Sequence, residues 1–233
     1  MSRINQIVLS CEHADRRVPS AYLHLFSEDP SVLTTHRAYD IGIMKLAKTV
    51  AGILHRPLFT YYISRLLIDP NRSLNNPDLF SGFSKTLSRT EKEQLIQAFY
   101  HPYRELVTQH IRQQIQDGRQ VIHLSLHSFT PELHGQKRTA DIGILYDPCR
   151  PREKSLAIVL QDTLKRITGL RLRRNYPYRG NADGFTTTLR RTYHPRRYLG
   201  IEVEFNQALL TDRQSKARQL AEYFCLALKR TFR

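Results

Sequence analysis

Two histidines follow directly after expected β-strands of the chain, and their type and placement suit metal-assisted hydrolysis. His13 comes after the strand-like run at 7–10, and His127 comes after the run at 121–126. Two neutral imidazoles on rigid strand ends are a natural beginning for a zinc site, since a catalytic zinc takes about three protein ligands and keeps one position for water. The sequence therefore predicts a metal-assisted site. An ordinary pair of hydrogen-bonded histidines is the alternative.

An Asn–Arg pair and two carboxylates stand at comparable positions. Asn71 and Arg72 follow another extended run, and they offer the amide and guanidinium donors that recognise a substrate carboxylate. Glu202 and Glu204 share one face of the strand expected at 199–205, because side chains alternate along a strand. A carboxylate near the metal can take the proton of an attacking water.

The hydrophobic pattern supplies a scaffold that brings these strand ends together. Strand-like runs are expected at 7–10, 58–63, 66–68, 121–126, 141–146 and 199–205. Helices are expected at 34–54, from the capping box at Ser88 to Gly118 with a kink or split at Pro102, from Pro151 to Gly169, and from Asp212 onward, with a long loop at 74–87. This alternation predicts a mostly parallel sheet between helices, in one domain spanning 1–233. Ligands of such sheets collect beyond the carboxyl ends of the strands.

The composition is that of a globular chain with excess positive charge. Of 233 residues, 40% are hydrophobic and 24% charged, and Lys+Arg 36 against Asp+Glu 21 gives a net charge of +15. The basic residues are dispersed without a zinc-finger or helix-turn-helix pattern, so a nucleic-acid partner is not expected. No apolar run reaches the roughly 18 to 20 residues of a membrane span, and no disulfide or C-x-x-C spacing is evident. A cytoplasmic location is the expectation.

Six segments in sequence resemble the N-formylglutamate amidohydrolase family. They are Ser10-Cys11-Glu12-His13-Ala14, His36 to Gly42, Ser64 to Arg72, His127-Ser128-Phe129-Thr130-Pro131, Asn175 to Gly180 and Glu204-Phe205-Asn206-Gln207. The resemblance covers about residues 7 to 212. Two of the motifs, Asp69-x-Asn71-Arg72 and His127-Ser128-Phe129, are more distantly similar to those of the zinc carboxypeptidase superfamily. The resemblance implies an α/β protein: a three-layer α/β/α sandwich with a mostly parallel mixed sheet, of the zinc-carboxypeptidase-like (phosphorylase/hydrolase-like) fold.

The same resemblance implies a metal centre. His13 and His127 would be ligands of one Zn²⁺ ion per chain. Zinc carboxypeptidases supply an acidic ligand three residues after the first histidine, a position that Arg16 occupies here. Because a guanidinium cannot bind a cation, another residue must complete the set. Asp40, expected in the first turns of the following helix, is the preferred third ligand, and Glu12 is the alternative.

The resemblance also implies catalytic and substrate-binding residues. Glu204, rather than Glu202, would act as general base and acid, activating water and then protonating the leaving amine. Arg65 would hold a second acidic group of the substrate or stabilise the oxyanion. The substrate would further be bound by Asn71 and Arg72 at its α-carboxylate and enclosed by the loop of Asn175 and Tyr178. The structural alternatives are an ion pair of Arg72 with Asp69, a turn cap at Asn175 and simple packing of Tyr178.

Together these observations predict a zinc-dependent amidohydrolase. It would cleave the linear amide of an N-acylated acidic amino acid such as N-formylglutamate, and this small molecule would be its partner, with no membrane involved. One alternative is a related zinc amidase or peptidase that acts on another amide or peptide. Another is a non-catalytic basic domain that binds an anionic polymer. The acyl group, the amino acid and the oligomeric state stay open.

Overall fold

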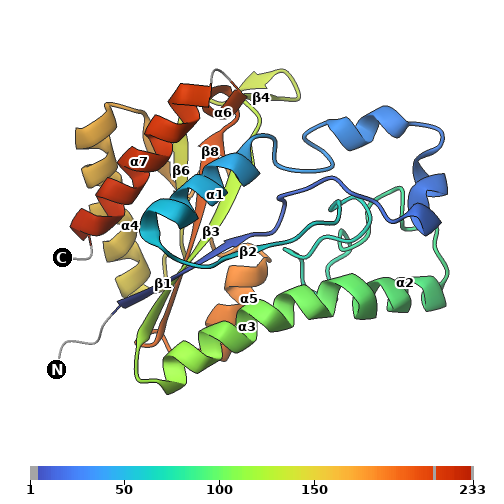
Figure 1. Ribbon diagram of the computed structural model, residues 1–233, viewed down its shortest axis with the longest axis horizontal. Helices are drawn as coiled ribbons and strands as arrows, with labels where there is room; N and C mark the ends of the chain where they lie inside the picture. The colour runs from blue at the N-terminus through green and yellow to red at the C-terminus, as the bar shows by residue number, and fades with distance from the viewer. Residues whose placement is uncertain (1–4, 212–213, 232–233) are drawn as a thin grey trace.

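One six-stranded mixed sheet forms the centre of the computed structural model, which describes residues 5–211 and 214–231 (Figure 1). The strand order is β2-β1-β3-β8-β6-β7. The strands are β1 (Asn5–Cys11), β2 (Leu58–Thr60), β3 (Gln120–Phe129), β6 (Ile142–Leu145), β7 (Leu172–Arg174) and β8 (Tyr198–Asn206). Only β6 and β8 pair antiparallel among these neighbours, which confirms the predicted mostly parallel sheet.

Helices cover both faces of this sheet. One face carries α1 (Ile43–Leu54), α4 (Pro151–Thr168) and α7 (Gln214–Thr231), and the other carries α3 (His101–Gln116) and α5 (Phe185–Thr192) (Figure 1). Successive residues of β1 show the division, because Val8 packs in the cluster with α3 and α5 whereas Leu9 packs in the cluster with α1, α4 and α7. The predicted three-layer α/β/α arrangement is confirmed.

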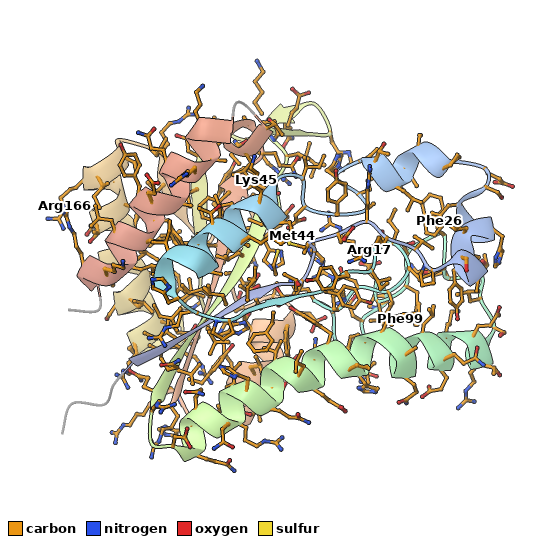
Figure 2. The ribbon with its side chains drawn as sticks, viewed as in Figure 1. Arg17, Phe26, Met44, Lys45, Phe99 and Arg166 are labelled. Atoms are coloured by element: carbon orange, nitrogen blue, oxygen red, sulfur yellow. The ribbon has the colours of Figure 1, made fainter. Side chains whose placement is uncertain are left out.

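Smaller elements extend this core. They are the 3-10 helices Ser20–Phe26 and Pro30–Thr34, α2 (Arg89–Leu95), a π-helical turn at Ile96–Tyr100, α6 (Ala208–Thr211) and a separate hairpin of β4 (Glu132–Leu133) and β5 (Gln136–Lys137). Basic side chains project from the outer surfaces of the helices, as Lys45 does on α1 and Arg166 on α4 (Figure 2). Within the described part of the chain, no helix is both long and apolar enough to cross a membrane.

Several element boundaries follow the predicted local signals. The Ser88 side chain accepts a hydrogen bond from the Glu91 N–H while the Glu91 carboxylate accepts one from the Ser88 N–H, so the capping box is confirmed. Pro102 does not split the helix, because the π-helical turn precedes it and it lies in the first turn of α3, where its missing N–H is tolerated. α4 begins at Pro151 and its C-cap is Gly169, as predicted. The expected start at Asp212 lies outside the described residues.

Two predictions beside the site are wrong. The helix expected at 34–54 begins only at Ile43, since Gly42 before it has a left-handed φ of 83°. Asp40 therefore lies in a turn ahead of the helix. A turn at residues 65–67 replaces the extended run expected at 66–68, with the Leu67 N–H donating to the Ser64 carbonyl at 2.9 Å. The Ser64 hydroxyl donates to the Ala38 carbonyl at 3.1 Å, so these two irregular segments support each other.

Candidate metal and substrate site

A cavity of about 350 Å³ opens where the carboxyl ends of β1, β3 and β8 meet. His13 lies just beyond β1, and the strand register pairs His127 of β3 with Glu204 of β8. The predicted site residues that line the cavity are His13, Asp40, Arg65, Asn71, Arg72, His127, Tyr178 and Glu204. Asn175 is not among the described residues that line the cavity. The sheet therefore brings together side chains that are far apart in sequence.

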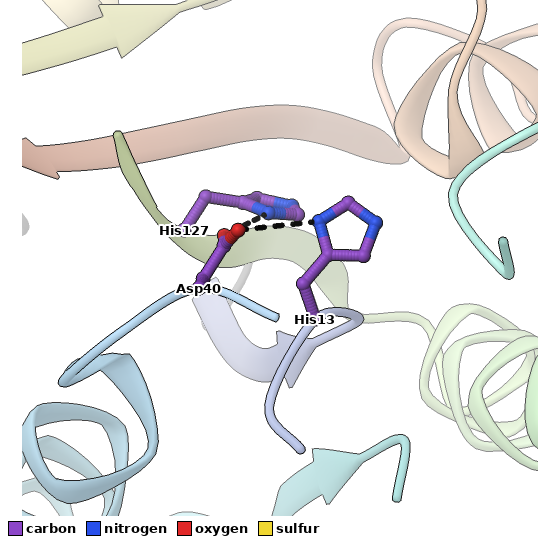
Figure 3. A group of neighbouring side chains, drawn as sticks. All are labelled: His13, Asp40 and His127. Carbon is purple, nitrogen blue, oxygen red and sulfur yellow. Dashed lines mark hydrogen bonds and ion pairs between the residues drawn. The ribbon is translucent and has the colours of Figure 1, made fainter. Parts of the chain in front are cut away.

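His13, Asp40 and His127 form a compact buried group in this cavity (Figure 3). The Asp40 Oδ2 atom lies 3.1 Å from His127 Nδ1, and Asp40 Oδ1 lies 3.7 Å from His13 Nδ1. One potential ligand atom from each residue lies within 4.8 Å of the other two. Two imidazoles and one carboxylate are a donor set that zinc accepts.

Each imidazole is held from behind by a second carboxylate. His13 Nε2 lies 2.8 Å from Asp69 Oδ1, and His127 Nε2 lies 3.2 Å from Glu12 Oε2. A carboxylate on Nε2 favours the proton at that nitrogen, so the Nδ1 lone pair points toward Asp40. In this tautomer the Nδ1 lone pairs and the Asp40 carboxylate oxygens face one another at distances that a shared metal ion allows. The three residues therefore fit a bound metal ion.

Glu12 lies behind His127 and does not line the cavity. Its Oε1 accepts a hydrogen bond from the Tyr103 hydroxyl at 2.9 Å, and its Oε2 accepts one from the Ser125 hydroxyl at 2.5 Å. Burial raises the pKa of Glu12, but His127, His123 and the Ser10 hydroxyl group outweigh burial and hold the pKa well below its usual range. Glu12 is thus an ionised support for the imidazole, and Asp40 is the carboxylate that faces both histidines.

Asp40 is positioned by backbone contacts and by Arg65. Its N–H donates to the His13 carbonyl at 2.9 Å, and the Ser128 N–H donates to its Oδ2 at 3.0 Å. The Arg65 NH1 group lies 3.2 Å from Asp40 Oδ1 and 3.1 Å from His13 Nδ1. Burial raises the pKa of Asp40, yet Arg65 and the imidazoles bring it well below its ordinary value. Asp40 is therefore an ionised carboxylate, and the guanidinium of Arg65 lies beside it and His13.

Glu204 is a buried carboxyl group that lacks a complete set of partners. Its residue is 5% exposed, and its Oε2 atom has no hydrogen-bond partner among the described residues. Burial raises the pKa of Glu204 to about 7, with Asp40 and Glu202 adding to the rise and His127 opposing it. Glu202 also lines the cavity, but its carboxylate accepts a hydrogen bond from the Thr186 hydroxyl. Glu204 is the acid of this pair that is freer to exchange a proton.

The Asn71–Arg72 turn borders the cavity with hydrogen-bond donors. The Asn71 Oδ1 atom accepts from the Phe185 N–H at 2.8 Å, so its amide NH₂ group remains available to face a ligand. Arg72 NH1 donates to the Asp183 carbonyl at 3.0 Å. The alternative ion pair with Asp69 has a long Nε–Oδ2 distance of 3.9 Å, which leaves much of the Arg72 guanidinium available.

Asn175 and Tyr178 belong to one loop but lie differently. The Asn175 Oδ1 atom accepts hydrogen bonds from the Tyr146 N–H at 3.0 Å and the Gly180 N–H at 3.2 Å, so it braces the loop. A Cβ atom at Gly180 would lie 2.1 Å from the Tyr146 nitrogen, and only glycine fits there. Tyr178 lines the cavity and is 46% exposed. Asn175 shapes this wall, and Tyr178 faces the cavity.

Sequence reasoning missed two sets of residues. The hydroxyl groups behind His127 come from Ser125 and Tyr103, and the alternation of β3 is the signal that places Ser125 on the same face as His127. Tyr103 lies on the buried side of α3 and gives no distinct sequence signal. Arg138, which lines the cavity, is one of many dispersed basic residues and follows a hairpin too short to predict.

Comparison with known proteins identifies similar sequences and structures. A family model described as N-formylglutamate amidohydrolase matches residues 5–211. A crystal structure of a gene product from Agrobacterium tumefaciens is similar, with a TM-score of 0.84, 28% identity, and 97% of this chain and 89% of that chain covered. The N-formylglutamate amidohydrolase from Ralstonia eutropha shares the fold, with a TM-score of 0.72, 19% identity, and 97% and 92% covered. No curated protein sequence matches significantly.

Proposed function

The chain belongs to the N-formylglutamate amidohydrolase family, and from this premise we propose that it is a zinc-dependent hydrolase that cleaves the linear amide of an N-formylated acidic amino acid. One observation carries the proposal: the buried Oε2 atom of Glu204, which has no hydrogen-bond partner among the described residues, belongs to a side chain that shares a cavity with the His13–Asp40–His127 group. A buried polar atom without a partner is costly for stability. Such a group beside potential metal ligands is typical of a catalytic site.

His13, Asp40 and His127 would hold the zinc ion. When bound, zinc supplies a Lewis acid that polarises the amide carbonyl and lowers the pKa of water. The Asp69 and Glu12 carboxylates keep the two imidazoles oriented and increase their basicity as ligands. Arg65, next to Asp40, would supply a positive charge that stabilises the oxygen that becomes negative during the reaction.

Glu204 would move the proton in this reaction. Its carboxylate accepts a proton from water while the water oxygen bonds to the amide carbon. It then delivers that proton to the amide nitrogen as the carbon–nitrogen bond breaks. The products are formate and the free amino acid, and Glu204 ends in its starting state. A pKa of about 7 suits a group that must both accept and donate a proton near neutral pH.

Asn71 and Arg72 would orient the substrate by its α-carboxylate. The Asn71 amide and the Arg72 guanidinium both line the cavity and offer N–H donors to an anion. Anchoring this carboxylate places the neighbouring amide at a fixed distance from the reacting groups, which is the positional part of catalysis. Asn175 would contribute by holding the loop from which Tyr178 meets the substrate.

A combined metal and substrate measurement tests the proposal. The purified protein should contain about one zinc per chain and should hydrolyse N-formyl amino acids faster than their N-acetyl counterparts, with acidic members preferred. Removal of zinc by a chelator should abolish turnover, and added zinc should restore it. A protein that binds no zinc and cleaves none of these amides would contradict the proposal and favour a non-catalytic basic domain. Zinc-dependent cleavage confined to peptides would contradict the substrate assignment alone.

A further inference from the structure

The guanidinium groups around the cavity differ in what already occupies their donors. The NH1 group of Arg65 is engaged by Asp40 and His13, and its other nitrogens donate to the carbonyl groups of Arg37 and His36. Arg65 is therefore committed to the protein on three sides. An anionic ligand would have to compete with these contacts for its donors.

Arg138 lines the same cavity with far weaker contacts. Its NH1 group lies 3.3 Å from the Tyr178 hydroxyl oxygen and 3.5 Å from the Thr130 hydroxyl oxygen. Both partners are neutral. In the described ranges 5–211 and 214–231, no carboxylate lies within 4.0 Å of the Arg138 guanidinium. This half-buried cation therefore lacks a counter-ion.

Arg138 is nevertheless held in a defined position. It follows the β4–β5 hairpin, and its N–H donates to the Pro131 carbonyl at 2.7 Å. The centre of its guanidinium lies 5.8 Å from the centroid of the Phe129 ring and 5.3 Å from that of Tyr178. Contacts with ring faces orient a guanidinium without consuming its N–H donors. Most of the five donors of Arg138 thus remain free for a ligand.

We propose that Arg138 and the Tyr178 hydroxyl form a second carboxylate-binding subsite, which selects N-acyl amino acids with an acidic side chain. The proposal rests on the proposed function, in which Asn71 and Arg72 bind the α-carboxylate. The Tyr178 oxygen accepts a hydrogen bond from Arg138, so its own proton can be donated to the same carboxylate. A planar guanidinium and a phenol that converge on one oxygen pair match a carboxylate and not a neutral amide.

The subsite gives a role to one of the four arginines that line the cavity, which are Arg65, Arg72, Arg138 and Arg179. A dicarboxylic substrate carries two negative charges, and a counter-ion at each end would fix both its position and its orientation. A neutral side chain would leave Arg138 without a counter-ion, so binding of such a substrate would gain nothing from this arginine. Selection is then expressed as a ratio of kcat/KM values for two substrates of the same shape.

N-formylglutamate and N-formylglutamine provide that pair, since they have nearly the same shape and differ only in carrying a side-chain carboxylate or a neutral carboxamide. The wild type should prefer the glutamate compound by about 10- to 100-fold in kcat/KM. Arg138→Gln should reduce this preference to less than about threefold, mainly by raising the KM for N-formylglutamate. Arg138→Lys should give an intermediate ratio, because it keeps the charge but loses the planar fork. Lys137→Gln is the matched control: it removes one exposed charge from the same hairpin outside the cavity and should keep the wild-type ratio.

Three results would contradict the subsite, and they can be told apart. A wild-type glutamate preference in both Arg138→Gln and Arg138→Lys would overturn the subsite and leave the proposed function standing. A reduced preference in Lys137→Gln equal to that in Arg138→Gln would also overturn it, since the effect would then be one of general charge. A wild type that hydrolyses neither compound would overturn the proposed function and the subsite with it.

Discussion

The two ends of β8 bury acidic side chains in opposite ways. Beside its start, Glu153 is completely buried and its Oε2 lies 3.0 Å from the Nε atom of Arg190. The same pair satisfies the backbone of Gly200, whose N–H donates to Glu153 Oε1 at 3.0 Å and whose carbonyl accepts from Arg190 NH2 at 2.8 Å. At the other end of the strand, Glu204 Oε2 is buried, and no hydrogen-bond partner for it lies within residues 5–211 and 214–231.

The sheet register gives the reason for the difference. β6 pairs with β8 only from Glu202 to Phe205, so in the described part of the chain the backbone of Gly200 has no neighbouring strand on that side. The Glu153–Arg190 ion pair takes the place of the missing strand there. At Glu204, β3 and β6 flank β8, and the side chain is not needed to satisfy the backbone. A buried carboxylate whose oxygens all have partners, like that of Glu153, thus stabilises the fold. A buried carboxyl oxygen that lacks a partner and lies beside a cavity, like that of Glu204, indicates a catalytic role.

Loss of a histidine from the site should have the largest effect. His13→Ala and His127→Ala should each lose most of the bound zinc, because two ligands cannot replace three, and turnover should fall to background. Elemental analysis and an assay with N-formylglutamate measure both changes. His134→Ala, at an exposed position of the β4–β5 hairpin, is the matched control and should keep its zinc. Full zinc retention in both site variants would show that His13 and His127 do not hold the metal.

Glu204→Gln should give the next largest change and would separate chemistry from stability. The amide keeps the shape of the carboxyl group but cannot accept a proton from water, so kcat should fall by about 10² to 10⁴. Zinc content and the urea midpoint of unfolding should not fall, because Oε2 gives up no hydrogen bond. Glu202→Gln is the control, with an expected loss of less than about tenfold. The opposite result, with Glu202→Gln inactive and Glu204→Gln active, would exchange the roles of the two acids.

Glu153→Gln should affect stability and leave the chemistry intact. The change would leave Arg190 buried without its counter-ion, which costs about 3–5 kcal/mol in the free energy of unfolding. Urea unfolding measures this loss, and kcat per folded molecule should remain at the wild-type value. Glu222→Gln is a matched control, since Glu222 pairs with Arg218 on an exposed helix surface, where such a pair contributes about 0.3–0.5 kcal/mol. A loss as small as that of the control would contradict a stabilising role for the buried pair.

A smaller, pH-dependent effect is expected from His123, a buried group that is satisfied without charge. Its Nε2 lies 2.7 Å from the Ser10 hydroxyl oxygen and its Nδ1 lies 2.8 Å from the Tyr198 hydroxyl oxygen. Burial lowers the pKa of His123 to about 4, whereas an unfolded histidine titrates near about 6.5. Between these values the unfolded chain binds a proton that the native protein does not. Stability should therefore fall as the pH decreases through this window.

Urea unfolding at pH 7 and pH 4.5 measures this effect. The wild type should lose about 2–3 kcal/mol more than His123→Gln between the two pH values, because the variant lacks the titrating group. Comparison of the two pH responses removes the contribution of the other acids. Equal losses in the two proteins would show that His123 does not remain neutral in the fold.

Local sequence signals determined many elements and the general location of the site. The capping box at Ser88 and the limits at Pro151 and Gly169 depend on residues within a few positions of one another, and the structure confirms them. The placement of His13 and His127 at one edge follows because parallel strands end on the same side of a sheet. A regular pattern of strands and helices is thus sufficient to predict where side chains meet.

Only the tertiary structure determined which of these side chains face the cavity and which support them from behind. Asp40 lies ahead of α1 because its N–H bonds to the His13 carbonyl, a contact that helical periodicity does not reveal. Glu12 lies behind His127 because of partners on β3 and α3, and Arg138 meets Tyr178 across 40 residues of sequence. Local propensity acts over one or two helical turns. Register, burial and the pairing of charges depend on segments that become neighbours only when the sheet and its two helical layers assemble.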